Sequence, residues 1–559
     1  MESERRRKAR FNMDRSMKTL AMVAAGLLAM NPLPAFAKGQ PNFVIIVADD
    51  LGFSDIGAFG GEIRTPNLDA LAKAGSLLTN FHAAPTCSPT RAMLLSGTDN
   101  HTAGVGAMAE SRLEAGGDKG TVQWGYEGVI TRRVATLAER LREGGYHTIL
   151  SGKWHLGLAP EQNPATRGFM TSFALLQGAS NHFGGPMGPA DNPNMRATFT
   201  HDGNEVSVPA DFYSSDYFTT QLLRQIDARP KTKPFFAYLA FTAPHSPLQA
   251  PKEDIARYAG RYDAGWAVLR EERLRRMRRL GIIEAGVIPA PIEGYAEAWN
   301  RLTPVQKRVE ARKMEIFAAM VDRMDRNVGR LVDHLKRNGE FENSIFVFVS
   351  DNGPAAEGAE HYGRLPGMAA VIAASDTRYD AMGSKSSMVF LGPYWAQAAS
   401  APYRLFKGVT SEGGTRVPAF ITIPGRRPIK AHGAAFASIM DIAPTLLDAA
   451  SLPVKPVVEG REVAAVRGRS ILPYLTDMSR SVHPDDEAIT IELHGHRAVR
   501  QGPWKLLLLN RPFGDGAWAL YNLASDPAEQ HDLSAQLPDR RRSMIEAWNK
   551  FAAETRVAD

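Results

Sequence analysis

The sequence predicts an α/β protein in which helices cover both faces of a large, mostly parallel sheet, followed by a small C-terminal antiparallel α+β subdomain. Continuous apolar runs of the kind buried in parallel sheets recur along the chain, and helical patterns lie between them. After about residue 484 this alternation gives way to short strands with tight connections. At 559 residues, with 44% hydrophobic and 23% charged residues, the chain is long enough for one large core and a subdomain.

The expected elements follow one another in order along the chain. Apolar runs predict buried strands over residues 43–47, 146–150, 235–241, 345–349 and 419–423. Helical periodicity predicts helices over residues 68–74, 134–143 and 309–337. Gly, Pro and Asn indicate a long loop over residues 181–211, and an arginine-rich run predicts a charged surface helix over 269–280. The subdomain, residues 485–559, is expected to contain strands over 488–493, 497–501, 504–509 and 517–521 and a helix around 540–553.

Residues 1–37 have the pattern of a secretory signal peptide. A basic stretch precedes an apolar run over residues 20–30, and Ala35-Phe36-Ala37 supplies a cleavage site. Met13 or Met17 would also begin a complete signal, and the twin arginines near the start leave two export routes open. The apolar run is shorter than the roughly 20 residues that a spanning helix needs. We therefore expect export, to the periplasm, without a stable membrane anchor.

The charge of the chain gives no support to a nucleic-acid partner. The net charge is +6, but residues 1–37 carry seven basic and three acidic side chains. The remainder is left with a net charge of only +2, too small to favour binding to a polyanion.

Cys87 is the only cysteine of the chain, so no intramolecular disulfide is available to an exported protein. Pro89 suits the first turn of a helix, and apolar residues follow it at 93–95. Cys87 is thus expected at the positive end of a helix, where anionic groups are favoured. The alternative is that Cys87 is a buried free thiol without a catalytic role. A cysteine that forms no disulfide in an exported protein is, however, consistent with a catalytic residue.

Oxygen-bearing side chains follow two of the predicted strands. Asp49 and Asp50 come directly after the first strand, and Asp351 and Asn352 follow the strand over 345–349. Either pair alone is typical of a turn or a helix cap. Three carboxylates brought together repel one another and need a cation, and ligation by oxygen alone favours Ca²⁺ or Mg²⁺ over Mn²⁺.

Basic side chains also follow predicted strands. Lys153 and His155 come after the strand over 146–150, and their side chains point the same way if the chain stays extended. His245 stands between two prolines after the strand over 235–241, and Lys407 precedes a glycine-bearing stretch. Each could singly be an exposed lysine or a loop histidine. Ligands of α/β sheets bind beyond the carboxyl ends of the strands, so we expect these residues at one site.

The run Cys87-Ser88-Pro89-Thr90-Arg91, followed by a leucine-rich stretch and Ser96-Gly97, resembles the signature of the type I sulfatases. The other motifs of that family appear in its order: Asp49-Asp50, Lys153-x-His155, Pro244-His245, Asp351-Asn352-Gly353 and Lys407-Gly408. The resemblance implies an alkaline-phosphatase-like fold, with a large mixed, mostly parallel sheet sandwiched by helices. It also implies that residues 38–484 form the catalytic domain.

The resemblance further implies the chemistry of the site. Cys87 would be oxidised to formylglycine (3-oxoalanine) by a formylglycine-generating or equivalent maturation enzyme and would act as the nucleophile. The implied ligands of one Ca²⁺ are Asp49, Asp50, Asp351, Asn352 and the modified Cys87. Arg91 would hold the formylglycine, and Thr90 stands where many members have Ser. Lys153 and Lys407 would neutralise the sulfuryl oxygens, and Asp351 would act as the base. His245 would protonate the leaving oxygen, and His155 would accept a proton when sulfate leaves.

The expected function is hydrolysis of a small-molecule sulfate monoester, with aryl sulfates favoured. One alternative is a phosphonate monoester or phosphodiester hydrolase of the same superfamily, although Asn352 in place of His favours a sulfatase. Another is a noncatalytic calcium-binding exported protein, which an unmodified Cys87 would favour. The sequence carries no code that selects among aryl, alkyl and sugar sulfates, and none for the oligomeric state.

Overall fold

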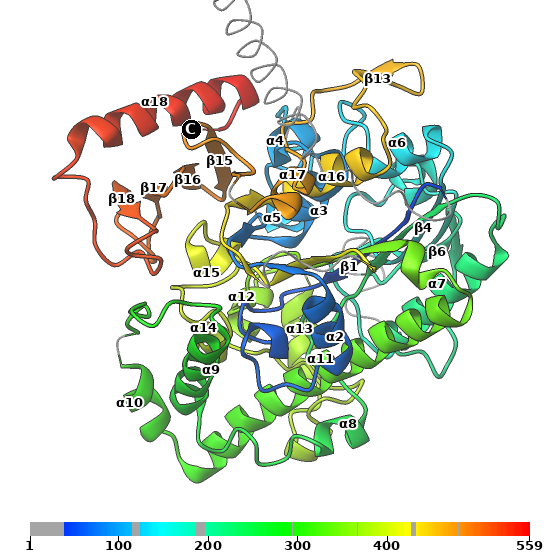
Figure 1. The fold of residues 1–559 in the computed structure, drawn as a ribbon. Helices are drawn as coiled ribbons and strands as arrows, with labels where there is room; N and C mark the ends of the chain where they lie inside the picture. Colours follow the sequence, from blue (N-terminus) through cyan, green and yellow to red (C-terminus); the bar gives the residue numbers. More distant parts are fainter. Residues whose placement is uncertain are drawn as a thin grey trace, which may run out of the picture. The chain divides into compact units, whose positions relative to one another are not determined.

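A ten-stranded mixed sheet forms the centre of the protein in the computed structural model (Figure 1). The structure describes residues 39–114, 123–185, 196–292, 294–365, 367–425, 432–478 and 480–558, so the predicted signal peptide over 1–37 lies outside the described residues. Among the described residues, every helix is too short or too polar to span a membrane.

The middle of the sheet is parallel, as predicted. Its strands run in the order β9 (Ser344–Ser350), β1 (Asn42–Ala48), β8 (Phe235–Ala240), β4 (His147–Lys153) and β5 (Thr171–Leu175). Every residue of β1 is buried, which explains its unbroken apolar sequence. β10 (Ala419–Thr422) joins β9 in the antiparallel sense. The short edge strands are β2 (Ser76–Leu78), β11 (His432–Gly433), β6 (Phe199–His201) and β7 (Asn204–Val206).

Helices cover both faces of this sheet. Figure 1 shows α2 (Pro66–Ala74), α7 (Ser214–Ala228) and α11 (Pro304–Arg337) on one side. On the other side lie α3 (Cys87–Ser96), α6 (Leu137–Glu143) and α16 (Ile442–Ala449). α11 begins earlier than the periodicity predicts because Thr303 caps the helix, forms a capping box with Gln306, and is followed by Pro304 at the first helical position. The doubly covered sheet confirms the predicted fold class.

Two sequence-based expectations about connecting segments need correction. The arginine-rich helix, α9 (Trp266–Leu280), is present, but Arg273 on it is fully buried rather than solvated. Arg273 pairs with Asp55 and with Glu62, so packing against acidic partners outweighs exposure of the charge. The long loop expected over 181–211 contains the β6–β7 hairpin in its described part, while residues 186–195 lie outside it.

The C-terminal part forms the predicted antiparallel sheet. Its strands are β15 (Ala488–Leu493), β16 (His496–Gln501), β17 (Trp504–Leu508) and β18 (Trp518–Asn522), in that order. α18 (Pro538–Thr555) packs on one face through Met544, Trp548 and Phe551. From β17, the ammonium of Lys505 lies 2.7 Å from Glu529 of the same subdomain and 2.8 Å from Glu412 of the large domain, and the second contact links the two parts. Residues 41–559 form one compact unit, and the boundary at residue 484 stays a prediction.

Candidate active site

The carboxyl ends of the central parallel strands deliver four of the predicted site residues to one edge of the sheet. Asp49 follows β1 directly, Asp351 follows β9, Lys153 ends β4, and His245 lies in the loop after β8. Backbone bonds fix these ends together: the amide of Asp351 donates to Ala48 at 3.0 Å, and that of Asp49 to Ala243 at 3.1 Å. The parallel arrangement thus brings distant motifs together as the sequence predicted.

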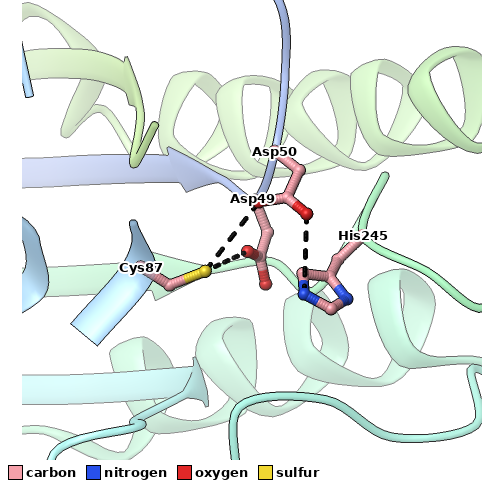
Figure 2. A group of neighbouring side chains, drawn as sticks. All are labelled: Asp49, Asp50, Cys87 and His245. Atoms are coloured by element: carbon pink, nitrogen blue, oxygen red, sulfur yellow. Dashed lines mark hydrogen bonds and ion pairs between the residues drawn. The ribbon is translucent and has the colours of Figure 1, made fainter. Parts of the chain in front are cut away.

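Helix α3 places Cys87 against the acidic pair. Its first residue is Cys87, whose sulfur lies 3.4 Å from Oδ1 of Asp49 and 3.8 Å from Oδ1 of Asp50 (Figure 2). Burial and the carboxylate of Asp351 raise the pKa of the Cys87 thiol well above its ordinary value. The thiol is therefore protonated and a poor nucleophile in itself.

Two buried lysines flank the acidic pair. Nζ of Lys153 donates to Oδ2 of Asp49 at 2.7 Å, and Nζ of Lys407 lies 2.7 Å from Oδ1 of Asp50. Burial alone would lower the pKa of each lysine, but the carboxylates outweigh it and raise the pKa. Both side chains are therefore charged. The backbone of Lys407 bonds to Pro354, which anchors it beside the Asp351 motif.

Arg91, one turn along α3 from Cys87, reaches the end of β9. It donates to Oδ2 of Asp351 from Nη2 at 2.7 Å and from Nε at 3.1 Å, and its Nη1 donates to the carbonyl of Lys153 at 3.0 Å. Burial and the carboxylate of Asp49 raise the pKa of Asp351 to about 7, whereas Arg91 and Lys153 oppose that rise. Arg91 thus holds two strand ends in register around the site.

His245 lies beside Asp50, with Nε2 3.5 Å from Oδ2 (Figure 2). Its Nδ1 bonds to the carbonyl of Ser246, which can only accept, so Nδ1 carries the proton. Burial lowers the pKa of His245 to about 4, although Asp50 opposes this shift. The ring is therefore neutral near neutral pH.

His155 does not lie as the sequence predicted. The strand ends at Lys153, and His155 has a left-handed backbone with φ of 57° instead of an extended one. Its Nε2 lies 3.2 Å from each carboxylate oxygen of Glu110, a residue that the sequence analysis missed. Glu110 lies on the short helix α5 (Ala109–Glu114), with no strand before it to mark it as a site residue.

Three of the predicted metal ligands, Asp49, Asp50 and Cys87, lie in one cluster with His245, whereas the predicted ligand Asp351 is not part of it. Ligand atoms of Asp49, Asp50, Cys87 and His245 all lie within 4.8 Å of one another. Asn352 donates to Oδ1 of Asp50 at 2.6 Å, while its own Oδ1 is buried without a hydrogen-bond donor among the described residues. A buried oxygen without a donor beside carboxylates is the kind of ligand that Ca²⁺ takes. In the structure, the ammonium groups of Lys153 and Lys407 neutralise the carboxylates of Asp49 and Asp50.

A cavity of about 730 Å³ opens onto this site. Its lining includes Cys87, His155, His245 and Lys407. It also includes large apolar and aromatic side chains, among them Met108, Tyr362, Leu365, Phe406 and Phe513. His494, His496 and Phe513 come from the C-terminal part of the chain, which the sequence analysis did not place at the site. The cavity volume is within the range of sites for small organic ligands.

Carboxylates, a buried cysteine and two charged lysines gather at the strand ends of a doubly covered sheet, and this arrangement suits the binding and hydrolysis of an anionic ester. The fold is alkaline-phosphatase-like. The family model described as Sulfatase matches residues 41–452, more than half of the chain. The chain belongs to the sulfatase family and is a sulfuric ester hydrolase.

Similar proteins agree with this assignment. An uncharacterized sulfatase of Schizosaccharomyces pombe is 44% identical over 532 residues, which cover 93% of this chain and 94% of that protein. An arylsulfatase of Klebsiella aerogenes is 40% identical over 455 residues, covering 79% of this chain and 95% of that protein. Among solved structures, Ps i-CgsB matches with a TM-score of 0.65 and 26% identity, covering 92% and 93% of the two chains.

Proposed function

We propose that this enzyme hydrolyses aryl sulfate monoesters, with Cys87 converted to formylglycine and one Ca²⁺ bound per chain. The observation that carries the proposal is the position of the Cys87 sulfur, 3.4 Å from Asp49 at the start of α3 and beside two charged lysines. The 40% identity to an arylsulfatase supports the aryl class, and the apolar and aromatic side chains in the cavity lining suit an aromatic leaving group.

The residues that would hold the cation are Asp49, Asp50, Asp351, Asn352 and residue 87. When bound, the ion would act as a Lewis acid that offsets the negative charge of the sulfuryl group. Lys153 and Lys407 are each bonded to a carboxylate that the cation would share. A cation that neutralised these carboxylates would allow the two ammonium groups to turn to the sulfuryl oxygens.

Proton transfer falls to the two histidines and one carboxylate. We assign Asp351 as the base toward a hydroxyl of residue 87 and His155 as the acceptor of a second proton there. His245 would protonate the leaving oxygen. Because burial lowers the pKa of His245 to about 4, this role requires the negative charge of the bound ester to raise the pKa.

We also propose that the protein is exported to the periplasm and matured by a formylglycine-generating or equivalent enzyme. The signal-like pattern of residues 1–37 supports export, and the intact Cys87-x-Pro89-x-Arg91 run supports maturation.

The test pairs mass spectrometry of the Cys87 peptide with a turnover screen. Protein from its native host should carry the aldehyde at residue 87 and should release sulfate from 4-nitrophenyl sulfate with a higher kcat/KM than phosphate or phosphonate from matched esters. A higher kcat/KM on phosphonate monoesters would contradict the sulfatase proposal. The solved phosphonate monoester hydrolase of Agrobacterium radiobacter, at 20% identity and a TM-score of 0.55, shares the fold alone. An unmodified Cys87 without turnover would support the noncatalytic alternative.

A further inference from the structure

A carboxylate–imidazole pair lies on the wall of the active-site cavity. Nε2 of His155 is 3.2 Å from both carboxylate oxygens of Glu110, and both residues line the cavity with Cys87. A carboxylate can only accept, so Nε2 of His155 carries the proton in this pair. The ring is held closely: a Cβ on Gly178 would lie 2.6 Å from its Cε1 and Nε2 atoms.

The other nitrogen of the same ring is left without a partner. Nδ1 of His155 is buried and accepts no hydrogen bond from the described residues. A buried ring nitrogen without a partner is costly in a folded protein, so its persistence in a reactive cavity indicates a role in binding or proton transfer.

The charges around His155 come from three elements. Glu110 of α5 favours the protonated ring, whereas Lys153 of β4 and Arg91 of α3 disfavour it. Burial, the strongest influence, lowers the pKa of His155, and Glu110 limits that fall. The pairing acts on the carboxylate as well, since His155 and Lys153 overcome burial and lower the pKa of Glu110 to about 2. Glu110 is thus ionised and would stabilise the positive form of the ring once His155 gained a second proton.

We propose that Glu110 is a positioning residue that fixes His155 with its proton on Nε2 and keeps Nδ1 free to accept a proton from residue 87. This rests on the proposed function, in which His155 is a base toward a hydroxyl of residue 87. In the step, the O–H bond breaks, the oxygen keeps the electron pair, and the proton forms a bond to Nδ1. The product is an imidazolium–carboxylate pair, which stabilises the transferred proton in the same way as the acid of a catalytic triad.

The first test needs neither aldehyde nor turnover. Nitrogen-15 NMR is recorded on full-length protein produced without a maturation enzyme, with the His155 signals assigned from a His155→Asn variant. The wild type should show Nε2 protonated and Nδ1 unprotonated. Glu110→Gln should lower the pKa of His155 by about 1 unit or more and mix the two tautomers, and Glu110→Asp should restore both readouts. An unchanged pKa and tautomer in Glu110→Gln would overturn the proposal.

Glu357 offers a matched control for this measurement. It is a second carboxyl of the same cavity, but its neighbours are Lys407 and Asp50 rather than His155, and its Oε2 has no hydrogen-bond donor among the described residues. Glu357→Gln should leave the pKa and the tautomer of His155 as in the wild type. The same change in both variants would show a general effect of cavity charge and would overturn a specific role of Glu110.

The second test uses the matured enzyme and 4-nitrophenyl sulfate. Glu110→Gln should lower kcat by about 10- to 100-fold and move the acidic limb of its pH profile to lower pH, because His155 then loses its proton more readily. In the presence of His155→Asn, Glu110→Gln should cause no further loss. Additive losses would overturn the proposal. A wild type without turnover would contradict the proposed function, while the NMR result would still decide the Glu110–His155 pairing.

Discussion

Arg91 and Asp351 form a fully buried ion pair in which Nε and Nη2 of the arginine both donate to a single oxygen, Oδ2. The other oxygen, Oδ1, accepts from the backbone amide of Asp50 at 3.2 Å. One carboxylate therefore joins the helix that carries Cys87, the end of β9 and the end of β1. Residues 260 positions apart are fixed around the cavity by this contact.

Removal of the arginine should destabilise the fold, because it leaves a buried carboxylate without its partner. Arg91→Met should lower the free energy of unfolding by about 3–5 kcal/mol in urea titrations of the unmodified protein. Arg542→Ala, which breaks the exposed pair of Arg542 with Asp539, is the control and should leave the unfolding midpoint unchanged. A loss for Arg91→Met no larger than that of the control would show that the pair does not support the fold.

Loss of the nucleophile should abolish sulfate release without unfolding the protein. Cys87→Ala removes no disulfide, so its circular dichroism and unfolding midpoint should match the wild type, while turnover should fall by about 10⁶-fold. Cys87→Ser keeps a single hydroxyl that can attack sulfur but has no second one to expel sulfate. It should release at most one leaving group per chain and gain the mass of one sulfuryl group. Repeated turnover by Cys87→Ser would contradict the need for formylglycine.

Calcium should stabilise the protein as well as activate it. Elemental analysis should find about one Ca²⁺ per chain, and exhaustive chelation should remove activity that Ca²⁺ restores better than Zn²⁺. At a free concentration about 100 times Kd, the ion should add about 2.7 kcal/mol to the free energy of unfolding. Asn352→Ala should reduce this gain in the free energy of unfolding, measured by urea titration with and without Ca²⁺, whereas the surface variant Asp376→Asn should not. Two zinc ions per chain would contradict the calcium proposal.

A histidine outside the active site should make stability depend on pH. Burial would lower the pKa of His483, but the hydrogen bonds and charges of Asp441 and Glu487 outweigh it and raise the pKa above its ordinary value of about 6.5. The extra stability is therefore fully present below that value and is lost as the pH rises through the raised pKa of the folded state.

His483→Gln should accordingly lower the unfolding midpoint more at about pH 5 than at about pH 9, measured by urea titration at each pH. His531→Gln is the control, because His531 is largely exposed and lies 3.6 Å from Asp526. The unfolding midpoint of His531→Gln should differ little from that of the wild type at either pH. A larger decrease of the His483→Gln midpoint at about pH 9 than at about pH 5 would contradict the raised pKa of His483.

The sequence predicted β1, β8 and β9 well because each is buried and consists mostly of consecutive apolar residues. It missed β5 and ended β4 three residues early, because these strands contain polar residues and glycine. It failed where a tertiary partner changes the meaning of a residue. Arg273 reads as a surface charge but is buried against Asp55 and Glu62. His155 was expected on an extended chain, yet the strand ends two residues earlier. Such outcomes depend on side chains that are far away in the sequence.

By itself the sequence determined the α/β class, the strand ends that carry Asp49 and Asp351, and the helix that begins at Cys87, because apolar periodicity and helix starts are local properties. Only the tertiary structure decided which partners these residues meet. It paired Arg91 with Asp351 and His155 with Glu110, and it brought His494, His496 and Phe513 to the cavity. These contacts join segments whose spacing in the chain carries no periodic signal, so they arise only when the sheet, its helices and the C-terminal part of the chain pack together.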